Sequence, residues 1–144
     1  MTDSTLSQPL YGATFGQAVQ RFFSKYAVFS GRASRSEFWW AWLFFVLLNA
    51  AFGIVFAIVM AATGTPTASG AVQITAPGVV VLVLWGVVLL GAIIPEIALT
   101  VRRLHDANFS GWMYLLHLIP YLGGLIVLIL NLLPSNPQGA RFDR

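Results

Sequence analysis

The chain has 144 residues, of which 58% are hydrophobic and only 9% are charged, whereas charged residues make up about a quarter of an average soluble domain. A soluble protein of this length could not bury that much apolar surface, so the composition predicts a one-domain membrane protein. The net charge of +3 comes from few, clustered basic residues, which argues against nucleic acid as a partner and favours an anionic membrane surface. The absence of cysteine excludes disulfides, thiolate metal sites and cysteine nucleophiles.

Residues 1–13 are rich in Ser, Thr, Gln, Pro and Gly and are expected to be flexible, ahead of a single membrane domain over residues 14–144. Residues 14–29 carry apolar and aromatic side chains at helical spacing, which predicts an amphipathic helix that begins with a Thr14–Gln17 capping box. This helix suits the headgroup boundary of a bilayer, and packing on the rest of the protein is an equal alternative. Its apolar face is expected to hold Phe15, Ala18, Val19, Phe22, Phe23, Tyr26 and Phe29, and its polar face Gln17, Gln20, Arg21, Ser24 and Lys25.

Three apolar runs follow, over residues 38–62, 78–101 and 112–133, with a tail over residues 134–144. The first run contains no charge, follows a capping box formed by Ser34 and Glu37, and is long enough at about 1.5 Å per residue to cross a hydrocarbon core of about 30 Å. We therefore predict an all-α membrane protein with an N-terminal interfacial amphipathic helix and three transmembrane helices.

The positions of the basic residues predict the orientation. Arg and Lys occur before the first run and again between the second and third runs, but the loop between the first two runs has none. This pattern places the N-terminus in the cytoplasm. Three full spans would leave the tail outside, where Arg141 and Arg144 fit poorly. The alternative is that the third run bends at Pro120 and Gly123-Gly124 as a re-entrant hairpin, which returns the tail to the cytoplasm.

Small residues recur every four positions along the first run, at Asn49, Gly53, Ala57 and Ala61. A stripe of this kind is typical of a helix-packing seam. We expect the seam to lie within the chain, and a homo-oligomer is the alternative.

Two polar motifs flank the apolar runs. The first reads Gly31-Arg32-Ala33-Ser34-Arg35-Ser36-Glu37-Phe38-Trp39-Trp40, and the second reads Arg102-Arg103-Leu104-His105-Asp106. Together they resemble the DUF805 family (domain of unknown function 805, YhaH-like), whose members typically show GRxxRxEFW before the first span and RRLHDxxxSGW before the last. The resemblance covers roughly Phe15 to the C-terminus. It implies a small integral protein of the bacterial inner membrane, and it implies no activity.

The motifs and the second run supply the candidate functional residues. The arginines are expected to line one cytoplasmic rim and to pair with Glu37 and Asp106 as an ionic clasp, with anionic lipid headgroups as additional ligands. Glu96 is expected to pair with a nearby arginine or to act as a proton or cation site. The candidates are Arg32, Arg35, Glu37, Glu96, Arg102, Arg103, His105 and Asp106.

The pair His105–Asp106 invites a metal-binding or hydrolytic interpretation. A metal site needs three or four ligands, and a hydrolase of this type needs a nucleophile motif; the sequence offers neither pattern. We therefore expect no catalytic residue, metal or cofactor. The predicted function is a non-enzymatic membrane protein whose arginine-rich cytoplasmic surface binds anionic lipid or a protein partner. The alternative is a small transporter or channel subunit that uses Glu96 and the arginines.

Overall fold

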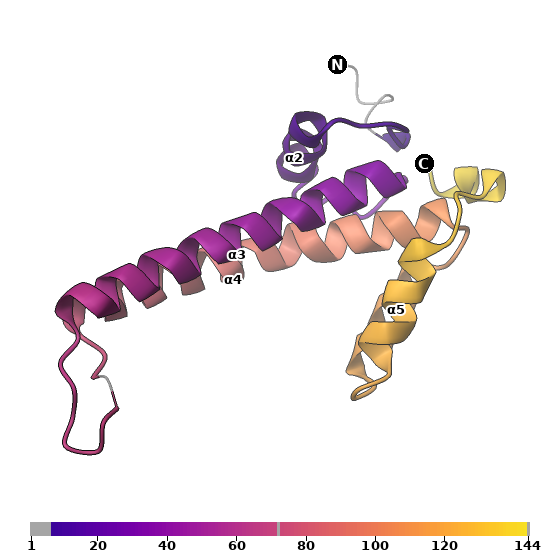
Figure 1. The fold of residues 1–144 in the computed structure, drawn as a ribbon. Helices are drawn as coiled ribbons and strands as arrows, with labels where there is room; N and C mark the ends of the chain where they lie inside the picture. The colour runs from indigo at the N-terminus through magenta and orange to yellow at the C-terminus, as the bar shows by residue number, and fades with distance from the viewer. Residues whose placement is uncertain (1–6, 72, 144) are drawn as a thin grey trace. The chain divides into compact units, whose positions relative to one another are not determined.

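A computed structural model describes residues 7–71 and 73–143, and no β-strand occurs among them, so the all-α prediction is confirmed. The described residues group into two compact units. The charged unit comprises the chain up to Leu43 and from Ile94 onward, and the apolar unit is Phe44–Ile93. The helices in chain order (Figure 1) are α2 (Phe15–Ser24), α3 (Arg35–Thr63), α4 (Ala76–Asp106), the 3₁₀ helix η1 (Gly111–Leu118), α5 (Gly123–Leu132) and the 3₁₀ helix η2 (Pro137–Phe142).

Within the described part of the chain, α3 and α4 are the two helices long and apolar enough to cross a membrane. They have 29 and 31 residues, which exceeds the length that a hydrocarbon core of about 30 Å requires. α4 continues through Pro95 and ends at Asp106. The Arg102–Asp106 motif therefore lies on the last turns of a helix, and its predicted place in a loop is corrected.

The start of α3 shows why the chain turns at this point. Ser34 Oγ accepts a hydrogen bond from the Glu37 backbone N–H at 3.2 Å, and Glu37 Oε2 accepts one from the Ser34 N–H at 2.8 Å. These reciprocal bonds satisfy two donors that the first turn of a helix otherwise leaves free. The predicted capping box at Ser34–Glu37 is confirmed.

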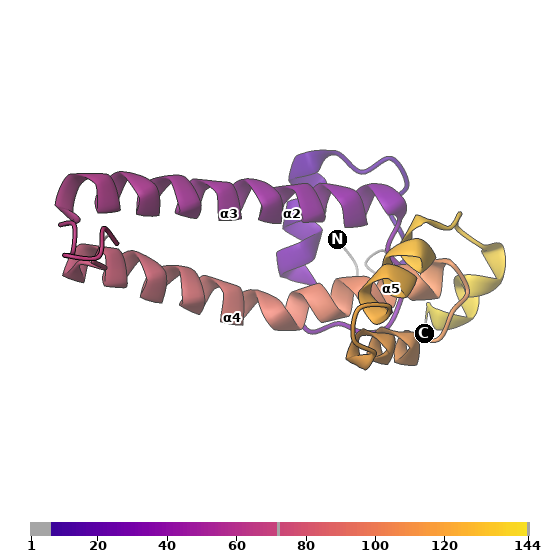
Figure 2. The same ribbon diagram turned by 60° about the horizontal axis from the view of Figure 1, so that its bottom comes forward.

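In the apolar unit, α3 and α4 run side by side (Figure 1, Figure 2) and a polar contact joins them. Trp85 Nε1 donates to Asn49 Oδ1 at 3.0 Å, and the Phe52 ring stacks on Trp85 with centroids 6.1 Å apart. Asn49 thus takes part in packing within the chain, whereas Ala57 and Ala61 of the small-residue stripe are exposed, so the expected seam is formed only in part. The unit contains no charged residue and exposes many large apolar side chains, which include Leu47, Ile54, Ile58, Val83, Val87 and Leu90.

The predicted helix over residues 112–133 is not continuous. η1 ends at Leu118, Tyr121 takes a positive φ of 65°, and α5 begins at Gly123. A Cβ atom at Gly123 would lie 1.8 Å from the Leu116 carbonyl oxygen, so this residue must be glycine for η1 and α5 to approach as they do. With 10 residues, α5 is about 15 Å long, half of a hydrocarbon core.

α2 begins at the predicted capping box, which is confirmed by the bonds between Thr14 and Gln17. The helix ends at Ser24, earlier than the predicted residue 29. Residues 1–13 are expected from the sequence to be flexible, and residues 1–6 lie outside the described part. From Ser7 onward, backbone groups form hydrogen bonds with other segments of the charged unit. The Ser7 carbonyl, for example, accepts from the Arg32 N–H at 2.9 Å.

Candidate functional site

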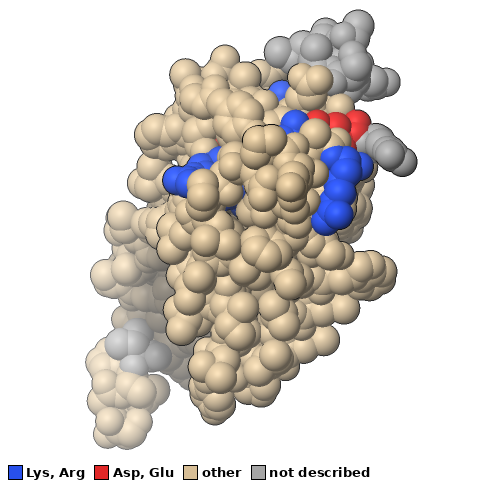
Figure 3. Space-filling model, turned by 90° about the vertical axis from the view of Figure 1, so that its right-hand side faces the viewer, with Lys and Arg blue, Asp and Glu red and all other residues tan. Residues whose placement is uncertain are grey.

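All Lys, Arg, Asp and Glu residues of the chain fall within the charged unit. On the face drawn in Figure 3 the blue and red atoms gather in one part of the surface, and the other described residues are tan. The candidate site is therefore built from segments distant in sequence: the N-terminal segment, the first turn of α3, the last turns of α4 and the tail.

The first of three groups in this unit is the Asp106 cluster, formed by Asp106, Arg103, Tyr11 and Ser135. Arg103 Nη1 donates to Asp106 Oδ2 at 2.8 Å, and both side chains are fully buried. The Tyr11 hydroxyl donates to Asp106 Oδ1 at 3.0 Å, and the Ser135 hydroxyl donates to Oδ2. Burial and the Asp106 carboxylate raise the pKa of Tyr11, which keeps its hydroxyl a donor. The carboxylate thus joins the N-terminal segment, α4 and the tail.

The remaining donors of Arg103 bind the C-terminal end of α5. Its Nε donates to the Asn131 carbonyl at 3.1 Å, and its Nη2 donates to the Leu133 carbonyl. Carbonyls at the end of a helix lack partners within the helix and carry partial negative charge, so a guanidinium satisfies them well. Each nitrogen of the Arg103 guanidinium has a partner within the chain, so this side chain connects α4 to the C-terminal end of α5 and has a structural role.

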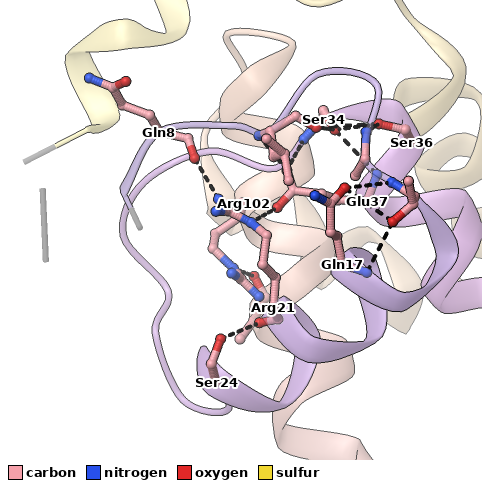
Figure 4. Close-up of polar contacts among 12 residues, drawn as sticks. Gln8, Gln17, Arg21, Ser24, Ser34, Ser36, Glu37 and Arg102 are labelled. Atoms are coloured by element: carbon pink, nitrogen blue, oxygen red, sulfur yellow. Dashed lines mark hydrogen bonds and ion pairs between the residues drawn. The ribbon is translucent and has the colours of Figure 1, made fainter. Parts of the chain in front are cut away.

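The second group is the Glu37 cluster, formed by Glu37, Arg21, Ser34 and Leu10. One carboxylate oxygen accepts from Arg21 Nε, and the other accepts from the Leu10 N–H at 3.0 Å and from the Ser34 N–H. Arg21 Nη2 also donates to the Gln8 carbonyl at 2.6 Å. Figure 4 draws these contacts, with Arg102 beside Arg21. Glu37 thus caps α3 and holds α2 against it.

Arg32 and His105 connect the first motif to the tail. Arg32 makes a bidentate ion pair with Asp143, with N–O distances of 2.8 and 2.7 Å. His105 Nδ1 lies 3.1 Å from the Gly31 carbonyl oxygen, and its ring stacks on Phe142 with centroids 4.1 Å apart. His105 therefore packs between the loop at Gly31 and the end of η2. The described residues contain no group of three His, Cys, Asp or Glu side chains that could hold a metal ion.

Arg35 and Glu96 remain at the surface. Arg35 is exposed and donates from Nε to the Leu133 carbonyl at 3.1 Å. Glu96 is exposed on α4, and its carboxylate has no hydrogen bond or ion pair to any other described residue. The predicted pair between Glu96 and a nearby arginine is not formed among the described residues, and Arg103 pairs with Asp106 instead.

The third group is the cation cluster, formed by Arg21, Lys25 and Arg102. Lys25 and Arg102 are each 1% exposed. Lys25 Nζ and Arg102 Nη2 have no hydrogen-bond partner among the described residues. Burial, with the positive charges of Arg21 and Arg102, lowers the pKa of Lys25 to about 8. The cluster is the one part of the charged unit in which the described residues leave buried cations unsatisfied.

Arg21 and Lys25 are not among the site residues predicted from the sequence, because their residue types placed them on the polar face of the amphipathic helix. The structure buries them beside Ala18 and Phe22, whereas Phe23 from the expected apolar face is exposed. The buried residues are spaced i, i+3, i+4 and i+7, which marks one face of a helix. This spacing is the feature of the sequence that could have predicted the burial of Arg21 and Lys25. Tyr11 was missed because a single tyrosine in a polar segment carries no such pattern.

Comparison with known proteins identifies the family. The family described as "Protein of unknown function (DUF805)" matches residues 26–144. The inner membrane protein YhaH of Escherichia coli (strain K12) is 34% identical over 118 residues, which cover 81% of this chain and 85% of that protein. The inner membrane protein YhaI of the same organism is 34% identical over 104 residues, 72% of this chain and 73% of that protein.

No solved structure matches the chain. The family match includes both polar motifs and begins at residue 26, so α2 precedes it. The resemblance noted in the sequence is confirmed, and the chain belongs to the DUF805 family.

Proposed function

We propose that this chain is a small, non-enzymatic integral protein of the bacterial inner membrane that presents its charged unit on the cytoplasmic side. α3 and α4 would be the two spans, since both are long and apolar enough to cross. The relatives YhaH and YhaI are named inner membrane proteins, which supports the same location here. The positive-inside rule supports the orientation, because the loop between α3 and α4 carries no charge.

The tail would return to the cytoplasmic side. η1 and α5 together form a helical hairpin, and each helix is too short to cross a bilayer alone. Arg32 pairs with Asp143, and the Gly31 N–H donates to the Phe142 carbonyl at 2.8 Å. These contacts join the segment before α3 to the end of the tail, which supports a re-entrant hairpin over a third span.

α2 would lie along the cytoplasmic interface. Its outward aromatic residues Phe15 and Phe23 are exposed, and aromatic rings favour the headgroup region. Trp40 and Trp42 at the start of α3 are also exposed and would mark the same depth.

The observation that carries the proposed role is the concentration of every basic residue in the charged unit. Arg35 and Arg141 are exposed there, and arginine binds phosphate oxygens well. The function we infer is the recruitment of anionic phospholipid, or of a partner through that lipid, at the cytoplasmic surface.

The lipid shell of the protein tests this role. Native nanodiscs extracted from cells should be enriched in phosphatidylglycerol and cardiolipin relative to the bulk membrane. The double variant Arg35→Gln/Arg141→Gln should lose most of that enrichment, and the charge-conserving variant Arg35→Lys/Arg141→Lys should keep it. A wild-type shell with the composition of the bulk membrane would contradict the role.

A second candidate rests on Glu96, an exposed carboxylate on a spanning helix without a partner among the described residues. Ionisable groups in such helices commonly serve ion or proton pathways. Proteoliposomes that contain the wild-type protein would then conduct protons or cations. Glu96→Gln should abolish the flux and Glu96→Asp should retain part of it. A wild-type flux no higher than that of empty liposomes would reject this candidate.

A further inference from the structure

One face of α2, continued by its C-cap residue Lys25, buries two cations near the last turns of α4. Ala18, Arg21, Phe22 and Lys25 form this face, and each is at most 9% exposed. Long basic side chains on an interfacial helix normally extend their charged ends toward water or headgroups. Here both cations point into the protein, so their charge must be balanced inside it.

Arg102 brings a third cation to the same place from α4. Its Nε donates to the Ala98 carbonyl at 3.1 Å, one turn earlier in the same helix, while its Nη2 has no partner among the described residues. The charges of Arg21 and Glu37 act on Arg102, and those of Arg21 and Arg102 act on Lys25. The three cations therefore lie within electrostatic reach of one another.

The described residues offer this cluster one adjacent carboxylate. Glu37 is bound to Arg21, and its other oxygen is occupied by the backbone N–H groups of Leu10 and Ser34. Asp143 also acts on Lys25 electrostatically, but its carboxylate is held in a bidentate pair by Arg32. Two buried donors, Lys25 Nζ and Arg102 Nη2, are left without an acceptor among the described residues. Buried charges without partners are rare and costly in folded proteins.

We propose that the cation cluster of Arg21, Lys25 and Arg102 is a binding site for one phosphate group, supplied by a phospholipid headgroup or by a phosphate in solution. Phosphate suits the donors because its several oxygens can accept from a planar guanidinium and from an ammonium at the same time. Arg102 and Lys25 would donate to different oxygens, and Arg21 would add charge while it holds Glu37. The phospholipid source rests on the proposed cytoplasmic placement of the charged unit, where headgroup phosphates lie at this depth.

The test uses the full chain, delipidated in a maltoside detergent that contains no phosphorus. Binding of dioleoyl phosphatidylglycerol is followed by native mass spectrometry, and binding of inorganic phosphate by calorimetry. Lys25→Met and Arg102→Met remove the two unpaired donors. Arg32→Met removes a basic residue of the same unit whose guanidinium is already paired with Asp143 and is the matched control, since it changes the net charge equally. Circular dichroism verifies the helical content of each variant.

Lys25→Met and Arg102→Met should each weaken binding by about tenfold or more, because each removes a charge-assisted hydrogen bond. Arg32→Met should change binding by less than about twofold. If Arg102→Met does not fold, Lys25→Met and the charge-conserving Lys25→Arg decide the matter, and Lys25→Arg should restore most of the affinity.

The outcomes separate the sources and the proposals. Competition between phosphatidylglycerol and inorganic phosphate supports the site with either ligand. Binding of the lipid alone identifies the headgroup, and binding of inorganic phosphate alone identifies a soluble ligand. Equal losses in all three methionine variants, or no binding by the wild-type protein, would overturn the inference. Loss of lipid enrichment in the Arg35→Gln/Arg141→Gln nanodiscs together with unchanged affinity in Lys25→Met would reject the buried site while the proposed surface role stands.

Discussion

Arg102 and Arg103 are neighbours in the chain and both are buried, yet their guanidinium groups are satisfied to different degrees. Arg103 donates to Asp106 and to two carbonyls at the end of α5. Arg102 donates to the carbonyl of Ala98, and its Nη2 has no partner among the described residues. Adjacent residues on a helix point about 100° apart, so Arg103 faces the Asp106 cluster and Arg102 faces Arg21 and Lys25. A single sequence motif thus supplies a structural tie and a candidate binding group.

The pair between Arg103 and Asp106 should be the more important of two ion pairs for stability. Asp106→Asn leaves Arg103 buried without its counterion and should lower the free energy of unfolding by about 3–5 kcal/mol. Asp143→Asn breaks the ion pair with Arg32. Both side chains of that pair are partly exposed, so this variant should lower the free energy of unfolding by only about 1 kcal/mol. Denaturant unfolding in detergent micelles, monitored by circular dichroism, measures both. Equal losses of unfolding free energy in the two variants would show that the Asp106 cluster does not hold the charged unit together more strongly than the Arg32–Asp143 pair.

Lys25 should make stability depend on pH. Its pKa in the folded protein, about 8, lies below its ordinary value of 10.5, so the folded state holds this proton less tightly than the unfolded state. The penalty for the buried charge is complete below pH 8 and is relieved as the pH rises from about 8 to about 10.5. The free energy of unfolding should therefore rise by up to about 3 kcal/mol across this window.

Lys25→Met is the variant that isolates this effect. In phosphate-free buffer it should be more stable than the wild-type protein at pH 7, and the difference between the two should shrink toward pH 10.5. A difference that does not change with pH would contradict a buried, unpaired Lys25. Saturating phosphate should also reduce the difference at pH 7, because ligand binding stabilises the folded wild-type protein.

The hairpin of η1 and α5 should be sensitive to one of two adjacent glycines. A Cβ atom at Gly123 would lie 1.8 Å from the Leu116 carbonyl oxygen, whereas at Gly124 the nearest atom belongs to His117 at 3.9 Å. Gly123→Ala should therefore lower the melting temperature by several degrees, since backbone must move, a change of about 1–3 kcal/mol. Gly124→Ala should be neutral or slightly stabilising, because alanine favours the helix. Similar melting temperatures for both variants would argue against the close approach.

The parts of the fold that depend on local pattern could be predicted from the sequence. Ser34 and Glu37 are three residues apart, and this spacing alone specifies the capping box at the start of α3. The lengths of the first two apolar runs likewise identified α3 and α4. In each case the deciding interaction lies within one helix, so a short stretch of sequence contains the information.

The third run and the cation cluster depend on tertiary contacts. Hydropathy does not distinguish a span from a hairpin of two short helices, and Pro120 and Gly123 indicated the hairpin only as an alternative. The burial of Arg21 and Lys25 is set by Glu37 and by the end of α4, both distant in sequence. Residue type alone places such cations on an exposed face, and only their spacing with Ala18 and Phe22 pointed inward.

The central claim is that the N-terminal segment, the last turns of α4 and the tail form one charged unit on one side of the membrane. Because the chain has no native cysteine, single cysteines report their side without background. Ser69→Cys lies in the loop between α3 and α4, and Ala140→Cys lies in η2; both positions are exposed. Each variant is labelled with a membrane-impermeant maleimide in intact spheroplasts and again after lysis. We predict that the thiol of the Ser69→Cys variant is labelled in intact spheroplasts and that of the Ala140→Cys variant only after lysis. Labelling of the Ala140→Cys variant in intact spheroplasts, together with protection of an Asn108→Cys variant at the end of α4, would contradict the shared side and require a third complete span.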